Sequence, residues 1–184
     1  MSDQQVKVGI AGLGFAGVEH LKGYQEYSRS EVLAVCDLNQ EHAKQVAEEY
    51  EIPFIYTDHR EMLANDDVNT ISVGLPNFLH APVTIDSLNA GKHVLCEKPP
   101  ARNGEEAIAM AEAAKANNRT LMYALVLRFG GDSLTLRKMV DDGKLGDIYF
   151  GKAGYVRRRG IPIGAGGWFV DKSKSGGGGL IDIG

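Results

Sequence analysis

Glycines at fixed spacing give the first sign of chemistry in this sequence. The segment 12–17, GLGFAG, follows the apolar run 6–11 and leads directly into a helical pattern. In such a strand–turn–helix the first glycine allows a tight turn, the second lets the backbone approach a pyrophosphate, and the third lets the helix pack on the strand. The residues expected in this diphosphate cradle are Gly12, Gly14, Phe15, Ala16 and Gly17. The alternative is a glycine-rich connection that binds nothing.

An acidic residue follows the second apolar run. Asp37 stands twenty residues beyond Gly17, directly after the predicted strand 31–36. An acid at this place accepts hydrogen bonds from the adenosine ribose hydroxyls and repels a 2′-phosphate, which favours NAD over NADP. A helix-capping role is the alternative, since Asn39 and Gln40 come next.

Two further polar groups follow predicted strands, at the sheet edge where open α/β sheets bind their ligands. The first is the segment 74–80, GLPNFLH, after the strand 68–73. Asn77 could hydrogen-bond a cofactor or cap the helix that begins there. His80 has the polarity for a cofactor or substrate contact, and a purely structural role is the alternative.

The second group is the segment 97–100, EKPP, after the strand 93–96. A lysine held by two following prolines is a candidate to polarise a substrate oxygen or to relay a proton. Burial and neighbouring charge could bring the pKa of Lys98 toward the working range. A solvated surface lysine is the alternative.

The elements that must position these groups alternate between strand and helix patterns. Strands are predicted over 6–11, 31–36, 54–56, 68–73, 93–96 and 121–127. Helices are predicted over 18–27, 40–50, 59–64, 79–89 and 105–117. This order is typical of a doubly wound parallel sheet with helices on both faces, the Rossmann type of α/β fold.

The pattern changes after Arg128. A helix is predicted over 133–142 and a long strand over 148–158, and the glycine-rich stretch 160–179 is expected to form a loop-like binding surface or lid. These pieces are too few to enclose a core of their own. We therefore predict a nucleotide-binding domain over 1–127, and the incomplete start of a second α/β domain over 128–184.

Composition narrows the class of protein further. The 184 residues carry a net charge of −4, which gives no bulk attraction to nucleic acid or to an anionic membrane. No apolar run approaches the ~20 residues of a membrane span, and no secretory signal is evident. The two cysteines, Cys36 and Cys96, are expected to be buried thiols in a reducing cytoplasm. Four other histidines show no metal-ligand spacing: His20, His42, His59 and His93.

Five motifs carry a family resemblance. GLGFAG at 12–17, CD at 36–37, GLPNFLH at 74–80, CEKPP at 96–100 and GGGGLIDIG at 176–184 resemble, in order and spacing, the Gfo/Idh/MocA oxidoreductases. The resemblance covers essentially the whole chain. It implies an N-terminal Rossmann domain and a C-terminal α/β domain built on an open mixed sheet. It also implies hydride transfer between a nicotinamide cofactor and the hydroxyl carbon of a ring or sugar.

The resemblance also implies roles for single residues. It places along the cofactor groove Leu75, Pro76, Asn77 and His80, with Glu97 near the nicotinamide ribose. It makes Lys98 the catalytic lysine and matches Asp182 to the acid of a D-x-x-x-H motif. The histidine of that motif would fall two positions beyond Gly184, so the resemblance implies a C-terminally truncated chain.

Substrate contacts are expected outside these motifs. Arg157 lies among three consecutive arginines that could grip substrate oxygens or form a solvated edge. Trp168 follows two glycines and could cover a sugar face or anchor local packing. Arg128 and Tyr123, near the domain junction, are further candidates to face the cleft.

These observations predict a cytoplasmic NAD-dependent dehydrogenase that acts on a sugar, polyol or inositol-like CH–OH group and needs no metal. The full-length protein is expected to form a homo-oligomer and to bind neither nucleic acid nor membrane. One alternative is a non-catalytic dinucleotide-binding protein or an inactive fragment. Another is a biliverdin-reductase-like enzyme, which the pairing of Lys98 with Asp182 disfavours.

Overall fold

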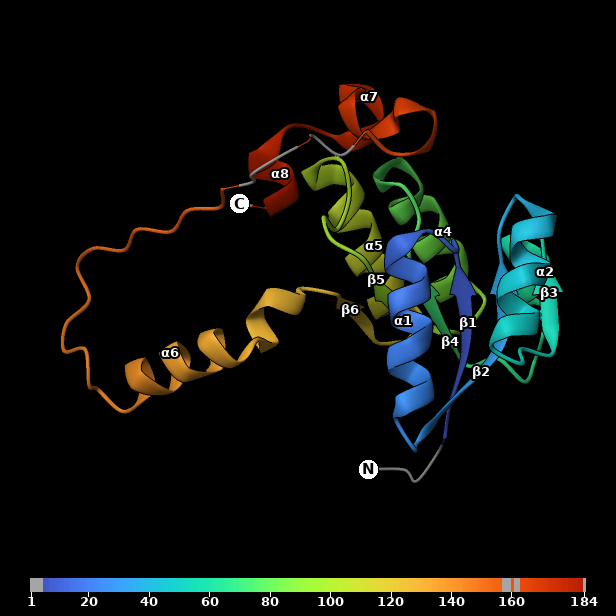
Figure 1. The fold of residues 1–184 in the computed structure, drawn as a ribbon, viewed down its shortest axis with the longest axis horizontal. Coiled ribbons are helices and arrows are strands. Elements are labelled where there is room, and N and C mark those ends of the chain that lie inside the picture. The colour runs from blue at the N-terminus through green and yellow to red at the C-terminus, as the bar shows by residue number, and fades with distance from the viewer. Residues whose placement is uncertain (1–4, 157–159, 161–162, 184) are drawn as a thin grey trace.

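A six-stranded parallel sheet forms the centre of the protein (Figure 1), in a computed structural model that describes residues 5–156, 160 and 163–183. The strands lie in the order β3-β2-β1-β4-β5-β6. Their bounds are β1 Val6–Ala11, β2 Ser30–Cys36, β3 Phe54–Tyr56, β4 Thr70–Val73, β5 His93–Cys96 and β6 Leu121–Tyr123. All neighbouring pairs are parallel, which confirms the doubly wound α/β prediction.

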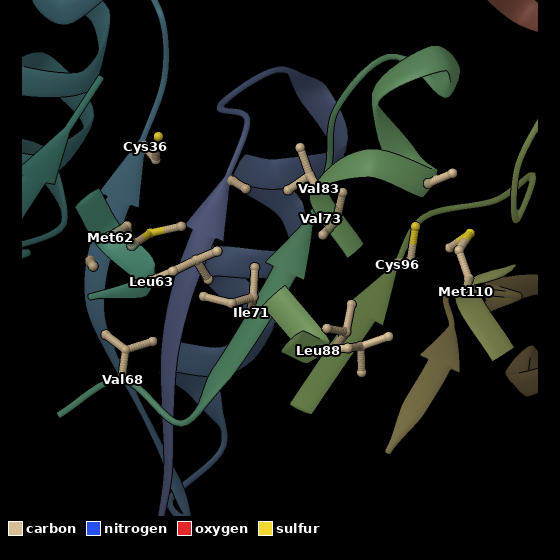
Figure 2. Packing of buried hydrophobic residues seen from close by; sticks show 14 of the residues in the cluster. Cys36, Met62, Leu63, Val68, Ile71, Val73, Val83, Leu88, Cys96 and Met110 are labelled. Atoms are coloured by element: carbon tan, nitrogen blue, oxygen red, sulfur yellow. The ribbon is translucent and has the colours of Figure 1, made fainter. Parts of the chain in front are cut away.

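Helices cover both faces of the sheet. They are α1 Phe15–Glu26, α2 Gln40–Glu49, α3 His59–Leu63, α4 Asn77–Asn89 and α5 Gly104–Ala116. One apolar cluster joins the sheet to α3, α4 and α5, and Figure 2 shows part of it, including Met62, Ile71, Leu88 and Met110. The other cluster packs α1 and α2 on the opposite face, around Ile10. Because both faces are covered, the strands are rich in buried apolar residues.

The order of the strands reverses at β1, whose neighbours are β2 and β4. Such a switch point opens a crevice beyond the strand C-termini, where ligands of open sheets bind. Hydrogen bonds between backbone groups also join the segments that follow the strands. The N–H of Gly12, after β1, donates to the carbonyl of Cys36, at the end of β2, at 2.8 Å. The N–H of Gly74 likewise donates to the carbonyl of Ala11 at 2.8 Å. The loops after β1, β2 and β4 therefore meet at one edge.

Both cysteines are buried, as predicted (Figure 2). Burial raises the pKa of the Cys36 thiol and of the Cys96 thiol to about 12 in each case. The thiolate is the reactive form of cysteine, so both side chains are inert packing groups at neutral pH.

The chain beyond β6 differs from prediction in two places. Helix α6 Gly131–Asp141 packs against the 3₁₀ helix η1 Val126–Phe129, but no strand forms over residues 148–156. An extended segment needs a neighbouring strand to pair its N–H and C=O groups, and the described residues place none beside it. The strand prediction is therefore wrong for these residues, while the remainder of the predicted strand, including Arg157, lies outside the described residues.

The glycine-rich stretch is also more structured than predicted. It contains the 3₁₀ helix η2 Ala165–Val170 and the helix α7 Lys172–Ser175, and α8 Gly179–Ile183 follows. Helix α7 packs against α4, so this segment returns to the first domain instead of forming an open loop. Among the helices that the described residues form, none combines the length and the apolar character needed to cross a membrane.

Candidate cofactor and active site

The loop after β1 is shaped by contacts that only glycine permits. Gly12 has φ +89°, and a Cβ on Gly17 would lie 1.8 Å from the carbonyl oxygen of Gly12. The loop after β4 approaches from the other side, since a Cβ on Gly74 would lie 2.8 Å from the Cα of Gly17. The loop after β1, the start of α1 and the loop after β4 therefore pack backbone against backbone, without intervening side chains.

Gly14 is different, because a Cβ there would meet no protein atom within 4 Å. Protein packing therefore does not require glycine at this position, but the close approach of a ligand would. Gly14 is also the N-cap of α1, which has no side-chain cap, so the first-turn N–H groups around Phe15 and Ala16 lack a side-chain partner. An uncapped helix N-terminus beside an open glycine fits a dinucleotide diphosphate.

Asp37 is fixed beside this loop by two backbone contacts. Its Oδ2 accepts the N–H of Leu13 at 2.9 Å, and its Oδ1 accepts the N–H of Asn39 at 2.9 Å. The cap of α2 is Asn39, not Asp37. Each carboxylate oxygen keeps acceptor capacity for a ribose hydroxyl. On the same helix His42 donates from Nε2 to the carbonyl of Leu13 at 2.9 Å, a contact that the sequence did not indicate.

Lys98 and Asp182, which lie 84 residues apart in the sequence, meet at the same edge of the sheet. The Lys98 Nζ is 2.6 Å from Asp182 Oδ1 and 3.2 Å from the Asp182 carbonyl. The carboxylate is largely buried, whereas 38% of the Lys98 side chain is exposed. An ammonium has three donors, and these two contacts leave one for a further acceptor.

Glu97 is held by protein groups on both of its oxygens. Oε1 accepts from His20 Nε2 at 3.0 Å, and Oε2 accepts the backbone N–H of Lys98 at 2.9 Å. Burial alone would raise the pKa of Glu97, but these donors and the positive charge of Lys98 hold it below its usual range. His20 lies on α1, one turn beyond the glycine loop, and its spacing to Glu97 carries no signal in the sequence.

The structure corrects the expected role of His80. Only 1% of this residue is exposed, and its two ring nitrogens lie 2.7 Å from the carbonyl of Pro99 and 2.8 Å from the carbonyl of Leu75. Burial outweighs these two hydrogen bonds and lowers the pKa of His80. A neutral imidazole has one N–H, so His80 donates to one of these two carbonyls while its other nitrogen also faces backbone. Neither ring nitrogen is directed toward a cofactor.

Asn77 is also engaged within the protein. It is buried and donates from Nδ2 to the carbonyl of Ser175 at 2.8 Å, which ties α4 to α7. It does not cap its helix, because the N-cap is Pro76 and makes no side-chain cap bond. The capping alternative is therefore wrong. Leu75 is partly buried and lies against the glycine loop, because its Cδ2 would be 2.8 Å from a Cβ on Gly12.

The structure does not gather the expected substrate contacts into one place. Arg128 is exposed in η1, and Arg157 lies outside the described residues. Trp168 packs against Phe169, with ring centroids 4.9 Å apart at 60°, which favours the local anchor over an open sugar platform. Among the described residues no group of three metal-ligating side chains comes together.

Comparison with known proteins decides which family these features belong to. A model of the oxidoreductase family with an NAD-binding Rossmann fold matches residues 6–125, and a model of the Gfo/Idh/MocA C-terminal domain matches residues 133–184. The chain belongs to the Gfo/Idh/MocA family. This confirms the resemblance on which the cofactor residues were assigned.

Two curated Gfo/Idh/MocA relatives resemble it over nearly its whole length. D-glucoside 3-dehydrogenase of Escherichia coli is 38% identical, over 100% of this chain and 52% of that protein. Levoglucosan dehydrogenase of Pseudarthrobacter phenanthrenivorans is 31% identical, over 98% of this chain and 48% of that protein. A solved levoglucosan dehydrogenase complex with NADH and levoglucosan superposes with a TM-score of 0.82 at 28% identity, over 98% of this chain and 51% of that one. The chain thus spans about half the length of the curated relatives it matches.

Proposed function

We propose that the protein is an NAD-dependent dehydrogenase that oxidises a ring hydroxyl of a sugar or glycoside, or reduces the corresponding ketone. The observation that supports this most directly is the ion pair of Lys98 with Asp182 beside the glycine cradle. A protein that only binds a dinucleotide has no need of a lysine held at this edge with one donor left over. The named activities of the relatives, on D-glucosides and levoglucosan, suggest a pyranose ring as substrate.

The residues of this protein would have the following roles in cofactor binding and catalysis. The cradle around Gly14 and the first turn of α1 hold the diphosphate, and Asp37 holds the adenosine ribose. NAD, when bound, supplies the hydride acceptor. The remaining donor of Lys98 takes the substrate oxygen and stabilises the negative charge that develops there. Asp182 fixes the position of the ammonium, and with it the direction of that donor, through the contact at 2.6 Å.

Three finer points belong to the same proposal. We place the domain boundary at 127/128, which β6 and the two family matches support. Arg128 and Trp168 are the proposed substrate contacts among the described residues. The assembled enzyme would be a homo-oligomer, which its native mass tests.

Turnover tests the proposed function. The purified protein is incubated with NAD and a panel of glucosides, 1,6-anhydro sugars, inositols and free aldoses, and NADH absorbance is followed. We expect a substrate-dependent rise with at least one pyranose ring compound. NAD binding by calorimetry without turnover on any compound would instead favour the non-catalytic binder.

The Asp37→Asn variant tests the choice of cofactor. It keeps one acceptor oxygen for the backbone but loses the charge that repels a 2′-phosphate. We expect NAD affinity to fall about 10- to 100-fold, the range of one hydrogen bond to a charged group, and NADP affinity to rise. Calorimetric titration with each cofactor measures both changes.

Asp58→Asn is the matched control, because Asp58 follows β3 as Asp37 follows β2 and accepts the N–H of Arg60 at 2.9 Å. This variant should leave both affinities unchanged. Tight NADP binding by the unmodified protein, with no binding of NAD, would contradict the role of Asp37.

A further inference from the structure

A series of partly buried hydrogen bonds runs from α1 to the backbone of Lys98. His20 Nδ1 lies 2.8 Å from Ser72 Oγ on β4, and its Nε2 lies 3.0 Å from Glu97 Oε1. The other oxygen of Glu97 accepts the Lys98 N–H at 2.9 Å. These hydrogen bonds link α1 and β4 to the loop that carries the lysine.

The chemistry of each group determines which atom donates and which accepts in these hydrogen bonds. The pKa of Glu97 lies below its usual range, so its carboxylate accepts only, and His20 must carry its proton on Nε2. In the neutral ring Nδ1 is then an acceptor, which takes the hydroxyl proton of Ser72. Ser72 is fully buried, so this contact with His20 Nδ1 supplies a partner for its hydroxyl inside the protein. From the Ser72 hydroxyl to the Lys98 N–H, each donor in this order therefore faces an acceptor.

The loop that carries Lys98 depends on such side-chain support. Pro99 and Pro100 have no N–H, so two successive positions after Lys98 offer no backbone donor. The Lys98 N–H is held by Glu97, and the Pro99 carbonyl is held by His80 at 2.7 Å. Two histidines therefore lie against this loop: His80 contacts its backbone directly, and His20 contacts it through the Glu97 carboxylate.

We propose that His20 is a positioning residue for Lys98: it fixes the Glu97 carboxylate, and Glu97 fixes the backbone from which the lysine reaches Asp182. The inference rests on the proposed function, because that function gives Lys98 its catalytic part. His20 itself touches neither Lys98 nor the place of the cofactor diphosphate in the described contacts. A purely structural histidine would stabilise the fold without affecting the ionisation of the Glu97 carboxylate.

The backbone amide of Lys98 reports the link directly by nuclear magnetic resonance. Its proton shift follows the ionisation of Glu97, the carboxylate to which it donates. Removal of the His20 donor destabilises the Glu97 carboxylate, so in His20→Leu the midpoint of this titration should move to higher pH. In His20→Gln the side-chain amide can still donate to Glu97 and should restore most of the original midpoint.

Turnover and cofactor binding complete the test. We expect His20→Leu to lower kcat about 10²-fold, the cost of a slightly misplaced catalytic group, while the NADH dissociation constant changes little. His59→Leu is the matched control, since His59 forms a similar pair with Asp86 at 2.9 Å away from the site. It should change neither kcat nor the Lys98 amide titration.

Two results would overturn the proposal: an unchanged Lys98 titration in folded His20→Leu, or an unchanged kcat in that variant. If His20→Leu does not fold, Ser72→Ala removes the other partner of the ring and should shift the Lys98 titration in the same direction by less. If the amide titration shifts but the unmodified protein oxidises no sugar, the link from His20 to Lys98 stands and the proposed function fails.

Discussion

The Lys98→Met variant is expected to lose about 10²- to 10⁴-fold in kcat while it still binds NAD, because a positioned acid–base or charge-stabilising group is worth that much. Methionine keeps the apolar stem and removes the ammonium that lies 2.6 Å from Asp182 Oδ1. The glycine cradle and Asp37 lie on other loops, so the dissociation constant of NAD should stay nearly unchanged. Initial rates and calorimetric titration separate the two effects.

Asp182→Asn extends this prediction to the partner. The asparagine amide still fills the space but lacks the negative charge that attracts the Lys98 ammonium. We therefore expect kcat to fall, as in Lys98→Met. Groups that act as a unit are not additive, so the double variant should be no slower than Lys98→Met alone. Lys22→Met is the control, because Lys22 pairs with Glu19 at 2.8 Å on the exposed face of α1. A Lys98→Met enzyme with full kcat would refute the assignment.

The second large effect is expected from a single methyl group in the glycine loop. In Gly17→Ala the new Cβ would lie 1.8 Å from the carbonyl oxygen of Gly12, so helix and loop must separate. Overpacking of this kind costs about 1–3 kcal/mol, and the displaced loop should weaken NAD binding about 10- to 100-fold. Thermal unfolding and calorimetric titration measure the two losses.

Gly23→Ala is the matched control on the same helix. A Cβ at Gly23 would meet nothing within 4 Å, and alanine is favoured over glycine inside a helix by about 0.5–1 kcal/mol. This variant should therefore be as stable as the unmodified protein or more stable, with unchanged NAD affinity. Equal behaviour of the two variants would show that the packing of Gly17 on Gly12 does not shape the cradle.

Local sequence patterns predicted the first domain well because its signals are short-range. Each predicted strand and helix of the first 123 residues is present, with ends that differ by a few residues. Helix α1 begins at Phe15 and not at Val18, because an N-cap glycine carries no side-chain signal of a helix start. The strand predicted over 121–127 ends at Tyr123, where the turn into η1 replaces the apolar continuation.

Beyond β6 the sequence pattern predicted the secondary structure less well. The alternation at 148–156 has the composition of a strand, but a strand exists only where another strand accepts its hydrogen bonds. The glycines near 176 suggested a loop, although α7 docks on α4 through the bond from Asn77 to Ser175. Both differences arise from partners distant in the sequence, which local pattern does not contain.

The sequence by itself determined the parallel sheet, the glycine cradle, the acid at Asp37 and the family, because each depends on residues close together along the chain. Only the tertiary structure decided which polar groups meet. It joined Lys98 to Asp182 across 84 positions, turned His80 inward to two backbone carbonyls, and placed His20 against Glu97. These contacts form because β-strands and helices far apart in sequence end at one edge of the sheet, where a buried polar group is stabilised by a hydrogen-bond partner.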